Sequence, residues 1–252
     1  MRTGQSIVNI PPPKAAGVIE YHFGRHKTFC PHGGPMNGQT ARLEIVRSLI
    51  ERCEIEQIVE TGTFRGTTTE WFAQFNIPVF SAEIQPRFAA FSQRRMMLRE
   101  NVCIENADSI AALTRWADLP EIRVRRTLFY LDAHWQKFLP LRKELEVINQ
   151  KFSEWIVVID DFKVPSDEGY GFDDYGPGSR LDFEYLTECN IRYAIAFVPN
   201  VKAKWETGWK RGCIILVSSQ YLAAKCRQLQ MLRPAFITSV DDIAERRAPE
   251  AA

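Results

Sequence analysis

The chain has 252 residues, of which 45% are hydrophobic and 25% charged, a composition typical of one α/β domain with or without appendages. Lysine and arginine number 32 against 31 aspartates and glutamates, so no overall basic field exists to hold a phosphate backbone and we expect no nucleic acid as the main substrate. No apolar run is long enough for a signal sequence or a bilayer span, so we expect a cytoplasmic protein without membrane insertion. The six cysteines form no Cys-x-x-Cys pair, which indicates buried thiols.

Residues 1–37 are rich in proline and glycine and are predicted to form an extended arm or loop. The main domain is predicted over residues 38–243, followed by a frayed tail at residues 244–252. Helices are predicted from apolar spacing at Gln39–Cys53, Thr67–Phe75, Arg87–Leu98, Ser109–Ala117, Leu139–Phe152 and Arg180–Cys189. Strands are predicted at Gln57–Thr61, Val79–Ile84, Val102–Ala107, Thr127–Asp132, Trp155–Asp160, Tyr193–Val198 and Cys213–Ser218.

Strand and helix alternate through most of the chain, which favours parallel crossovers over a sandwich. The last two predicted strands are joined by residues 199–212 without a convincing helix, so we expect them to pair antiparallel. The predicted fold is therefore an α/β, Rossmann-like, doubly wound sheet of seven strands with a C-terminal antiparallel hairpin.

The segment from Gln57 to Glu83 is typical of the nucleotide-binding end of such a sheet. A short apolar strand leads to a tight turn at Gly62, and Gly66 allows the next helix to begin close to the sheet. Glu83 then ends the second strand, where its carboxylate can accept hydrogen bonds from ribose hydroxyls. This arrangement predicts a cofactor that carries an adenosine.

Acids also end the fourth and fifth predicted strands: Asp132, with His134 two residues later, and the pair Asp160 and Asp161. Ligands bind beyond the carboxyl ends of strands in sheets of this type, so we expect the three carboxylates to converge. Unpaired, they would repel one another, and a divalent cation would compensate their charge. Oxygen ligands suit Mg²⁺ or Mn²⁺.

Over about residues 39–219 the chain resembles the class I S-adenosylmethionine-dependent methyltransferases, whose sheet has six parallel strands and one antiparallel strand. The run Glu60-Thr-Gly62-Thr63-Phe-Arg-Gly66 looks like the family's first motif, in which an acid precedes a glycine loop around the methionine half of the cofactor. Glu83 matches the family's ribose acid. Asp108 and Ser109, after the third strand, look like the adenine contact.

The acids after the fourth and fifth strands are similar to a metal-dependent subgroup that includes the macrocin- and mycinamicin-type sugar O-methyltransferases. This resemblance implies that Asp132, Asp160 and Asp161 hold Mg²⁺ and that His134 takes the proton from the acceptor hydroxyl, with Asp132 also in the catalytic set. It implies O-methylation of a small polar acceptor such as a sugar, glycan or natural product. A cation lowers the pKa of a hydroxyl, and a base removes its proton.

Acceptor contacts are predicted from position alone. The loop at residues 163–179 combines glycines, aromatic rings and acids, as a lid over a polar ring would. The residues predicted to contact the acceptor are His32, Tyr170, Asp173, Asp174 and Trp205. Packing within a loop, or a contact in the expected homo-oligomer, is an equal alternative for any one of them.

Simpler structural roles exist for three site residues. Asp108 could cap the helix that begins at Ser109, and Asp161 could cap the segment after its strand. His134 could be a hydrogen-bonded histidine at a strand end.

Two other functions stay open. The spacing of Gly62 and Glu83 would also fit a nicotinamide-dependent oxidoreductase, although the loop lacks Gly-x-Gly-x-x-Gly. The nonenzymatic alternative is a catalytically inactive, methyltransferase-like interaction protein, which would not need the acids and histidine.

Overall fold

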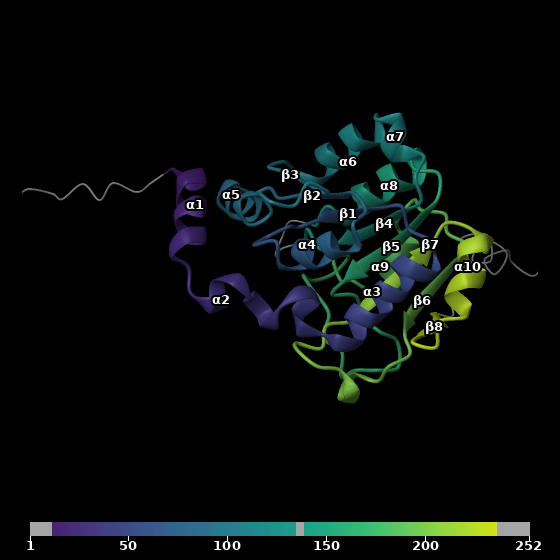
Figure 1. The fold of residues 1–252 in the computed structure, drawn as a ribbon. Helices are drawn as coiled ribbons and strands as arrows, with labels where there is room; N and C mark the ends of the chain where they lie inside the picture. Colours follow the sequence, from purple (N-terminus) through teal and green to yellow (C-terminus); the bar gives the residue numbers. More distant parts are fainter. Residues whose placement is uncertain (1–11, 135–138, 236–252) are drawn as a thin grey trace, which may run out of the picture.

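The computed structural model describes residues 12–134 and 139–235, and a mixed sheet lies at its centre (Figure 1). Its strands are β1 (Gln57–Thr61), β2 (Val79–Ala82), β3 (Val102–Glu105), β4 (Thr127–Leu131), β5 (Trp155–Asp160), β6 (Ile195–Pro199), β7 (Cys213–Val217) and β8 (Leu232–Ala235). They are arranged in the order β3-β2-β1-β4-β5-β7-β6-β8. The predicted doubly wound α/β fold is confirmed, with one strand more than the seven expected.

Strand direction follows the prediction. The pairs β1–β2, β2–β3, β1–β4 and β4–β5 are parallel, and β7 pairs antiparallel with both β5 and β6. The chain runs outward from β1 to β3 and then returns to β4 on the other side of β1. Ligand crevices in open α/β sheets form at such a reversal, beyond the carboxyl ends of the strands. Here that point lies between β1 and β4.

Helices cover both faces of the sheet. They are α3 (Thr40–Arg52), α4 (Thr67–Phe72), α5 (Pro86–Arg95), α6 (Ser109–Ala117), α7 (Pro120–Arg123), α8 (Leu141–Lys151), α9 (Phe183–Thr187) and α10 (Gln220–Arg227), with short 3₁₀ turns η3 (Ala73–Phe75) and η4 (Ala203–Trp205). Apolar side chains of α6, α8 and α9 pack on one face, and those of α3, α4 and α10 pack on the other. Central strands buried on both sides explain the continuous apolar runs in the sequence.

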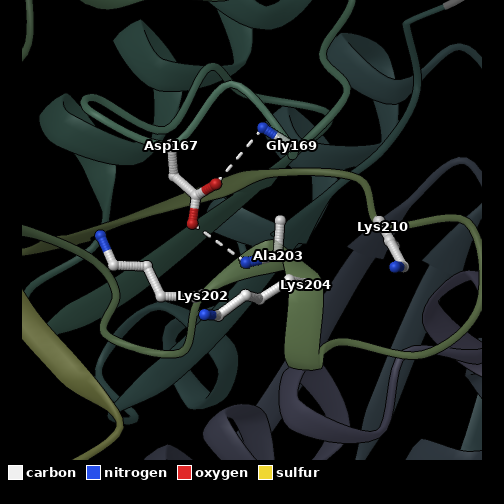
Figure 2. Close-up of a pocket in the computed structure, with 6 residues that line it drawn as sticks. All are labelled: Asp167, Gly169, Lys202, Ala203, Lys204 and Lys210. Carbon is white, nitrogen blue, oxygen red and sulfur yellow. Dashed lines mark hydrogen bonds between the residues drawn. The ribbon is translucent and has the colours of Figure 1, made fainter.

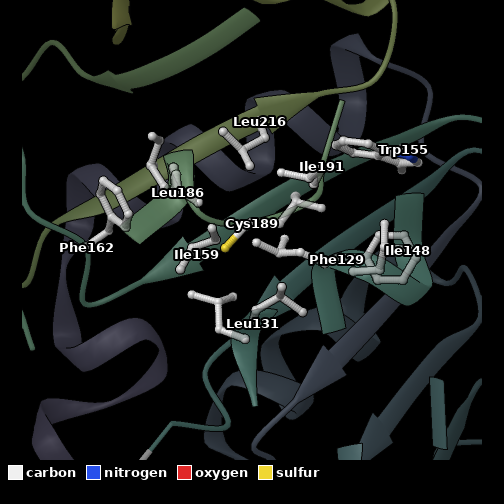
Figure 3. Packing of buried hydrophobic residues seen from close by; sticks show 14 of the residues in the cluster. Phe129, Leu131, Ile148, Trp155, Ile159, Phe162, Leu186, Cys189, Ile191 and Leu216 are labelled. Carbon is white, nitrogen blue, oxygen red and sulfur yellow. The ribbon is translucent and has the colours of Figure 1, made fainter. Parts of the chain in front are cut away.

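The first of these faces is well packed beside the candidate site. Figure 3 shows Phe129, Leu131 and Ile159 of neighbouring strands lying against Leu186 and Cys189. Each of these side chains is at most 4% exposed, and burying such an apolar side chain contributes about 1.5–3 kcal/mol. The ends of β4 and β5 are therefore held in fixed positions.

The prediction of an extended N-terminal arm is wrong for the described part of that segment. It forms α1 (Pro13–Phe23), α2 (His26–Phe29), η1 (Pro31–Gly33) and η2 (Pro35–Gly38). In Figure 1 the purple α1 lies beside α5. Gly17 permits this approach, because a Cβ there would stand 2.0 Å from the Arg87 carbonyl oxygen. Glu20 of α1 also accepts hydrogen bonds from the guanidinium groups of Arg65 and Arg87.

Two elements near the C-terminus were not predicted, namely α10 and β8. Strand β8 contains Pro234, which argues against a strand in the sequence, but β8 is at the sheet edge, where a missing N–H is tolerated. All six cysteines are free and four are buried, whereas Cys103 is exposed. None of the described helices has the length and apolar character needed to cross a membrane. The predicted tail at residues 244–252 lies outside the described residues.

Candidate functional site

The glycine loop after β1 has the tight backbone expected of it. Gly62 has a φ of +89°, and a Cβ there would stand 2.2 Å from the carbonyl oxygen of Asp132. Gly66 has a φ of +69° and is the N-cap of α4. Both positions therefore favour glycine, and the loop lies against the end of β4.

Glu60 lies beneath this loop. Its carboxylate is 2% exposed and accepts hydrogen bonds from the hydroxyls of Thr69 and Ser81. The Ser81 hydroxyl lies 2.5 Å from the Thr63 hydroxyl. Burial raises the pKa of Glu60 to about 7, against the lowering effect of its two hydroxyl donors.

Glu83 follows β2 and ties the loop to the start of α5. Its two carboxylate oxygens accept hydrogen bonds from the backbone N–H of Phe64 (2.7 Å) and of Gln85 (2.8 Å). Burial raises the pKa of Glu83, although these two bonds favour the charged form. Each carboxylate oxygen can accept a second bond, so the geometry leaves capacity for ribose hydroxyls.

Asp108 has the capping role that was one of its two predicted roles. Its Oδ1 accepts hydrogen bonds from the backbone N–H of Ile110 (3.0 Å) and of Ala111 (3.1 Å) at the start of α6. Ser109 is 4% exposed, and its hydroxyl interacts with the buried carboxyl of Glu144. The two residues follow β3, on the same side of β1 as Glu83.

Three of the residues predicted as metal ligands or as the base converge beyond the ends of β4 and β5. Asp132, His134 and Asp161 each offer one ligand atom, and these atoms lie within 4.8 Å of one another. The His134 Nε2 atom is 3.9 Å from a carboxylate oxygen of Asp132, 3.8 Å from one of Asp161 and 3.7 Å from one of Asp173. We call these four residues the rim cluster.

The pKa values of Asp132, Asp161 and His134 in the rim cluster are shifted in different directions. The Asp132 side chain is 39% exposed; its partial burial raises its pKa, and the nearby charges of Asp160 and Asp161 raise it further. Burial acts in the same direction on Asp161, but His134 and Arg211 lower its pKa to about 2. Burial would lower the pKa of His134, but the neighbouring carboxylates raise it overall. A divalent cation would relieve the repulsion between these carboxylates, so the residues fit a metal such as Mg²⁺.

Asp160, predicted as a metal ligand, is not part of this group. It forms a buried ion pair with Arg42 of α3, and it accepts hydrogen bonds from the Tyr130 hydroxyl (2.7 Å) and from the backbone N–H of Asp161 (2.9 Å). Side chains alternate along a strand, so Asp160 shares the α3 face with Val158. Asp161 instead has a φ of +52°, and this turn sends it to the rim.

Sequence reasoning missed Arg211, which organises the rim cluster from the connection between β6 and β7. Its guanidinium Nε donates to Asp161 at 2.5 Å, and a terminal nitrogen pairs with Asp173. Arg211 stands 50 residues from Asp161 in a loop without a recognisable motif, so only the antiparallel pairing of β5 with β7 reveals it.

The predicted acceptor residues separate into different environments. Asp173 joins the rim cluster, whereas Asp174 pairs with Arg180 at 3.2 Å. Tyr170 is 3% exposed and donates its hydroxyl to a backbone carbonyl, while Trp205 is 73% exposed. Of these four residues, only Asp173 therefore belongs to the rim cluster.

The fifth predicted acceptor residue, His32, lies next to the glycine loop. Its ring stacks on Phe64 with centroids 6.0 Å apart and contacts Trp209 at 4.4 Å. The N-terminal segment therefore reaches the glycine loop of the candidate site.

No protein-family model and no curated protein matches the chain. Among solved structures, a candidate O-methyltransferase from Klebsiella pneumoniae is 16% identical, with 84% of this chain and 93% of that chain covered and a TM-score of 0.53. A candidate caffeoyl-CoA O-methyltransferase from Staphylococcus aureus is 16% identical over 71% of this chain and 83% of its own (TM-score 0.49). The N-terminal domain of EvdMO1, crystallised with S-adenosylhomocysteine and D-fucose, is 15% identical over 71% and 82% (TM-score 0.46).

The likeness to the Klebsiella protein establishes a Rossmann-like methyltransferase fold for this chain.

Proposed function

We propose that the chain is an S-adenosylmethionine-dependent O-methyltransferase that acts on a hydroxyl of a small polar acceptor, with Mg²⁺ as its metal. The observation that carries this proposal is the contact between the two halves of the site: the Gly62 turn lies directly against Asp132 of the rim cluster. A donor held by the loop would thus lie beside the acids that position the acceptor oxygen.

In the donor half, Gly62, Thr63 and Gly66 would wrap the methionine part of the cofactor, with Glu60 beneath them. Glu83 would accept from the ribose hydroxyls, and Asp108 with Ser109 would contact the adenine. These roles agree with the buried carboxylates and the crowded glycine turn described above.

In the acceptor half, Asp132 and Asp161 would hold Mg²⁺, which prefers oxygen ligands over imidazole. When bound, the cation would lower the pKa of the acceptor hydroxyl. His134 is then left to take the hydroxyl proton through Nε2, which lies 3.8 Å from a carboxylate oxygen of Asp161 and 3.7 Å from one of Asp173. Arg211 would keep Asp161 and Asp173 oriented.

The acceptor in this proposal is a sugar, glycan or natural product, the reaction takes place in the cytoplasm, and the protein works as a homo-oligomer without nucleic acid. Donor, acceptor oxygen and base must be held in line, which is a contribution from positioning.

The test measures thermal unfolding of the full chain with S-adenosylhomocysteine, with NAD, and with Mg²⁺ both alone and together with S-adenosylhomocysteine. We expect S-adenosylhomocysteine to raise the melting temperature, NAD to leave it unchanged, and Mg²⁺ to add to the shift. Stabilisation by NAD alone would favour the oxidoreductase, and no response to any of the three would favour the interaction protein.

Turnover is then tested by mass-shift screening of acceptor mixtures with an isotopically labelled methyl donor. Methylation that disappears in EDTA and returns with Mg²⁺ is the expected result. Methylation that persists in EDTA would contradict the metal assignment while leaving the donor assignment in place.

A further inference from the structure

A pocket lined by lysines lies between the loop at residues 163–179 and the connection from β6 to β7, outside the rim cluster (Figure 2). Its volume is about 430 Å³, within the range of small-ligand sites. The residues that line this lysine pocket are Asp167, Gly169, Lys202, Ala203, Lys204 and Lys210.

Asp167 builds the pocket wall. One of its carboxylate oxygens accepts a hydrogen bond from the backbone N–H of Ala203 (3.0 Å), and the other accepts one from Gly169 (3.3 Å). Figure 2 shows both bonds. Asp167, the only acid among the described residues of the lining, therefore has backbone donors on both oxygens and joins two loops that are distant in sequence.

The three lysines outnumber the single carboxylate of Asp167 in the described lining, so the lining carries an excess of positive charge. Within residues 12–134 and 139–235, none of Lys202, Lys204 and Lys210 forms a salt bridge. In Figure 2 the amino groups of Lys202 and Lys204 lie on the same side of η4, and Lys210 lies at the other end of the pocket. The Lys204 ammonium is also 5.0 Å from the Trp205 ring, a cation–π contact that restricts it.

Backbone contacts connect the lysine pocket to the rim cluster. The carbonyl of Lys210 accepts a hydrogen bond from Gly171 at 2.9 Å, and the next residue, Arg211, pairs with Asp161 and Asp173. A ligand bound along the pocket would therefore have one end near the loop that holds the rim cluster.

We propose that the lysine pocket binds a phosphate group of the acceptor, so that the molecule methylated is a phosphate ester and not a neutral sugar. The part of this proposal that assigns the phosphate to the methylated acceptor rests on the proposed function. Anion binding by the pocket stands on the lysines alone, since ammonium groups are common phosphate ligands.

Calorimetric titration of the full chain with inorganic phosphate, and separately with methyl phosphate, tests the proposal at constant ionic strength set with chloride. We expect saturable binding of both anions, because a site for an ester must tolerate one esterified oxygen. The double variant Lys202→Gln/Lys210→Gln should weaken both by about tenfold or more. The control Lys143→Gln/Lys151→Gln removes the same charge from α8 and should bind as the parent chain does.

No saturable binding, equal weakening in the control, or binding of inorganic phosphate without methyl phosphate would overturn the proposal. Melting temperature and S-adenosylhomocysteine binding should stay unchanged in both variants, which shows that they fold. The titrations require neither methyl transfer nor the donor, so this proposal and the proposed function can fail separately.

Discussion

Gly62 lies directly against the main chain of Asp132, at the point where β1 and β4 end side by side. The Asp132 backbone N–H donates to the Thr61 carbonyl at 3.0 Å, and the carbonyl of Asp132 occupies the space that a Gly62 side chain would need. The turn expected to bind the donor and the first acid of the rim cluster thus form one structural unit.

This contact makes Gly62→Ala a sharp test. A methyl group there would meet the Asp132 carbonyl at 2.2 Å and would force a positive φ on alanine, so we expect loss of S-adenosylhomocysteine binding and a clear drop in stability. Calorimetry and denaturant unfolding measure the two effects. Gly176→Ala is the matched control, because Gly176 also has a positive φ but no atom within 4 Å of its Cβ position. Equal losses in both variants would show that backbone strain, and not the contact, is responsible.

Neutralising the neighbouring acids Asp160 and Asp161 should have different effects on stability and on Mg²⁺ binding. Asp160→Asn leaves the charge of Arg42 buried without its partner, which should cost about 3–5 kcal/mol of unfolding free energy. Asp161→Asn should cost less, because it also relieves repulsion with Asp132, but it should abolish Mg²⁺ binding. Denaturant unfolding and metal titration of both variants check this. A stable Asp160→Asn chain that fails to bind Mg²⁺ would restore the original ligand assignment.

His134→Gln should lower the rate of methyl transfer by about 10²–10⁴-fold, the usual contribution of a general base. Donor binding and Mg²⁺ affinity should change little, since the proposal assigns the cation to Asp132 and Asp161. Single-turnover kinetics, measured once an acceptor is known, separate the chemical step from binding. A variant that loses Mg²⁺ binding together with activity would make His134 a metal ligand and not the base.

Glu60 should make stability depend on pH. The pKa of Glu60 in the folded chain is about 7, above the ordinary value of 4.5. Between these two pH values the carboxyl group is protonated in the folded state and ionised in the unfolded state. The contribution is complete below pH 4.5 and is lost as the pH rises through 7, on the order of 3 kcal/mol in total. The Glu60→Gln variant has no carboxyl group to ionise at this position. The difference between its unfolding free energy and that of the parent chain should therefore shift in favour of the variant as the pH rises. Denaturant unfolding at several pH values measures the difference, and a constant difference would contradict the assignment.

Much of the fold was predictable because it follows from local patterns. Apolar runs of strand length, helical spacing between them and a glycine turn after the first strand determine an α/β sheet, and each of the seven predicted strands has its counterpart. The elements that were missed or misjudged depend on distant partners. Helix α1 packs on α5 through Gly17, and β8 tolerates Pro234 only because the strand is at the edge.

For the candidate site, the sequence by itself determined that acids end β4 and β5, because an acidic residue directly after an apolar run can be recognised from the sequence alone. Tertiary structure decided which of them meet. The alternation of side chains sends Asp160 to Arg42 across 118 residues, and the turn at Asp161 sends its carboxylate toward His134 and Arg211. Charge pairing between segments far apart in the chain leaves no local pattern, so the sequence supplied the acids and only the folded chain assigned their partners.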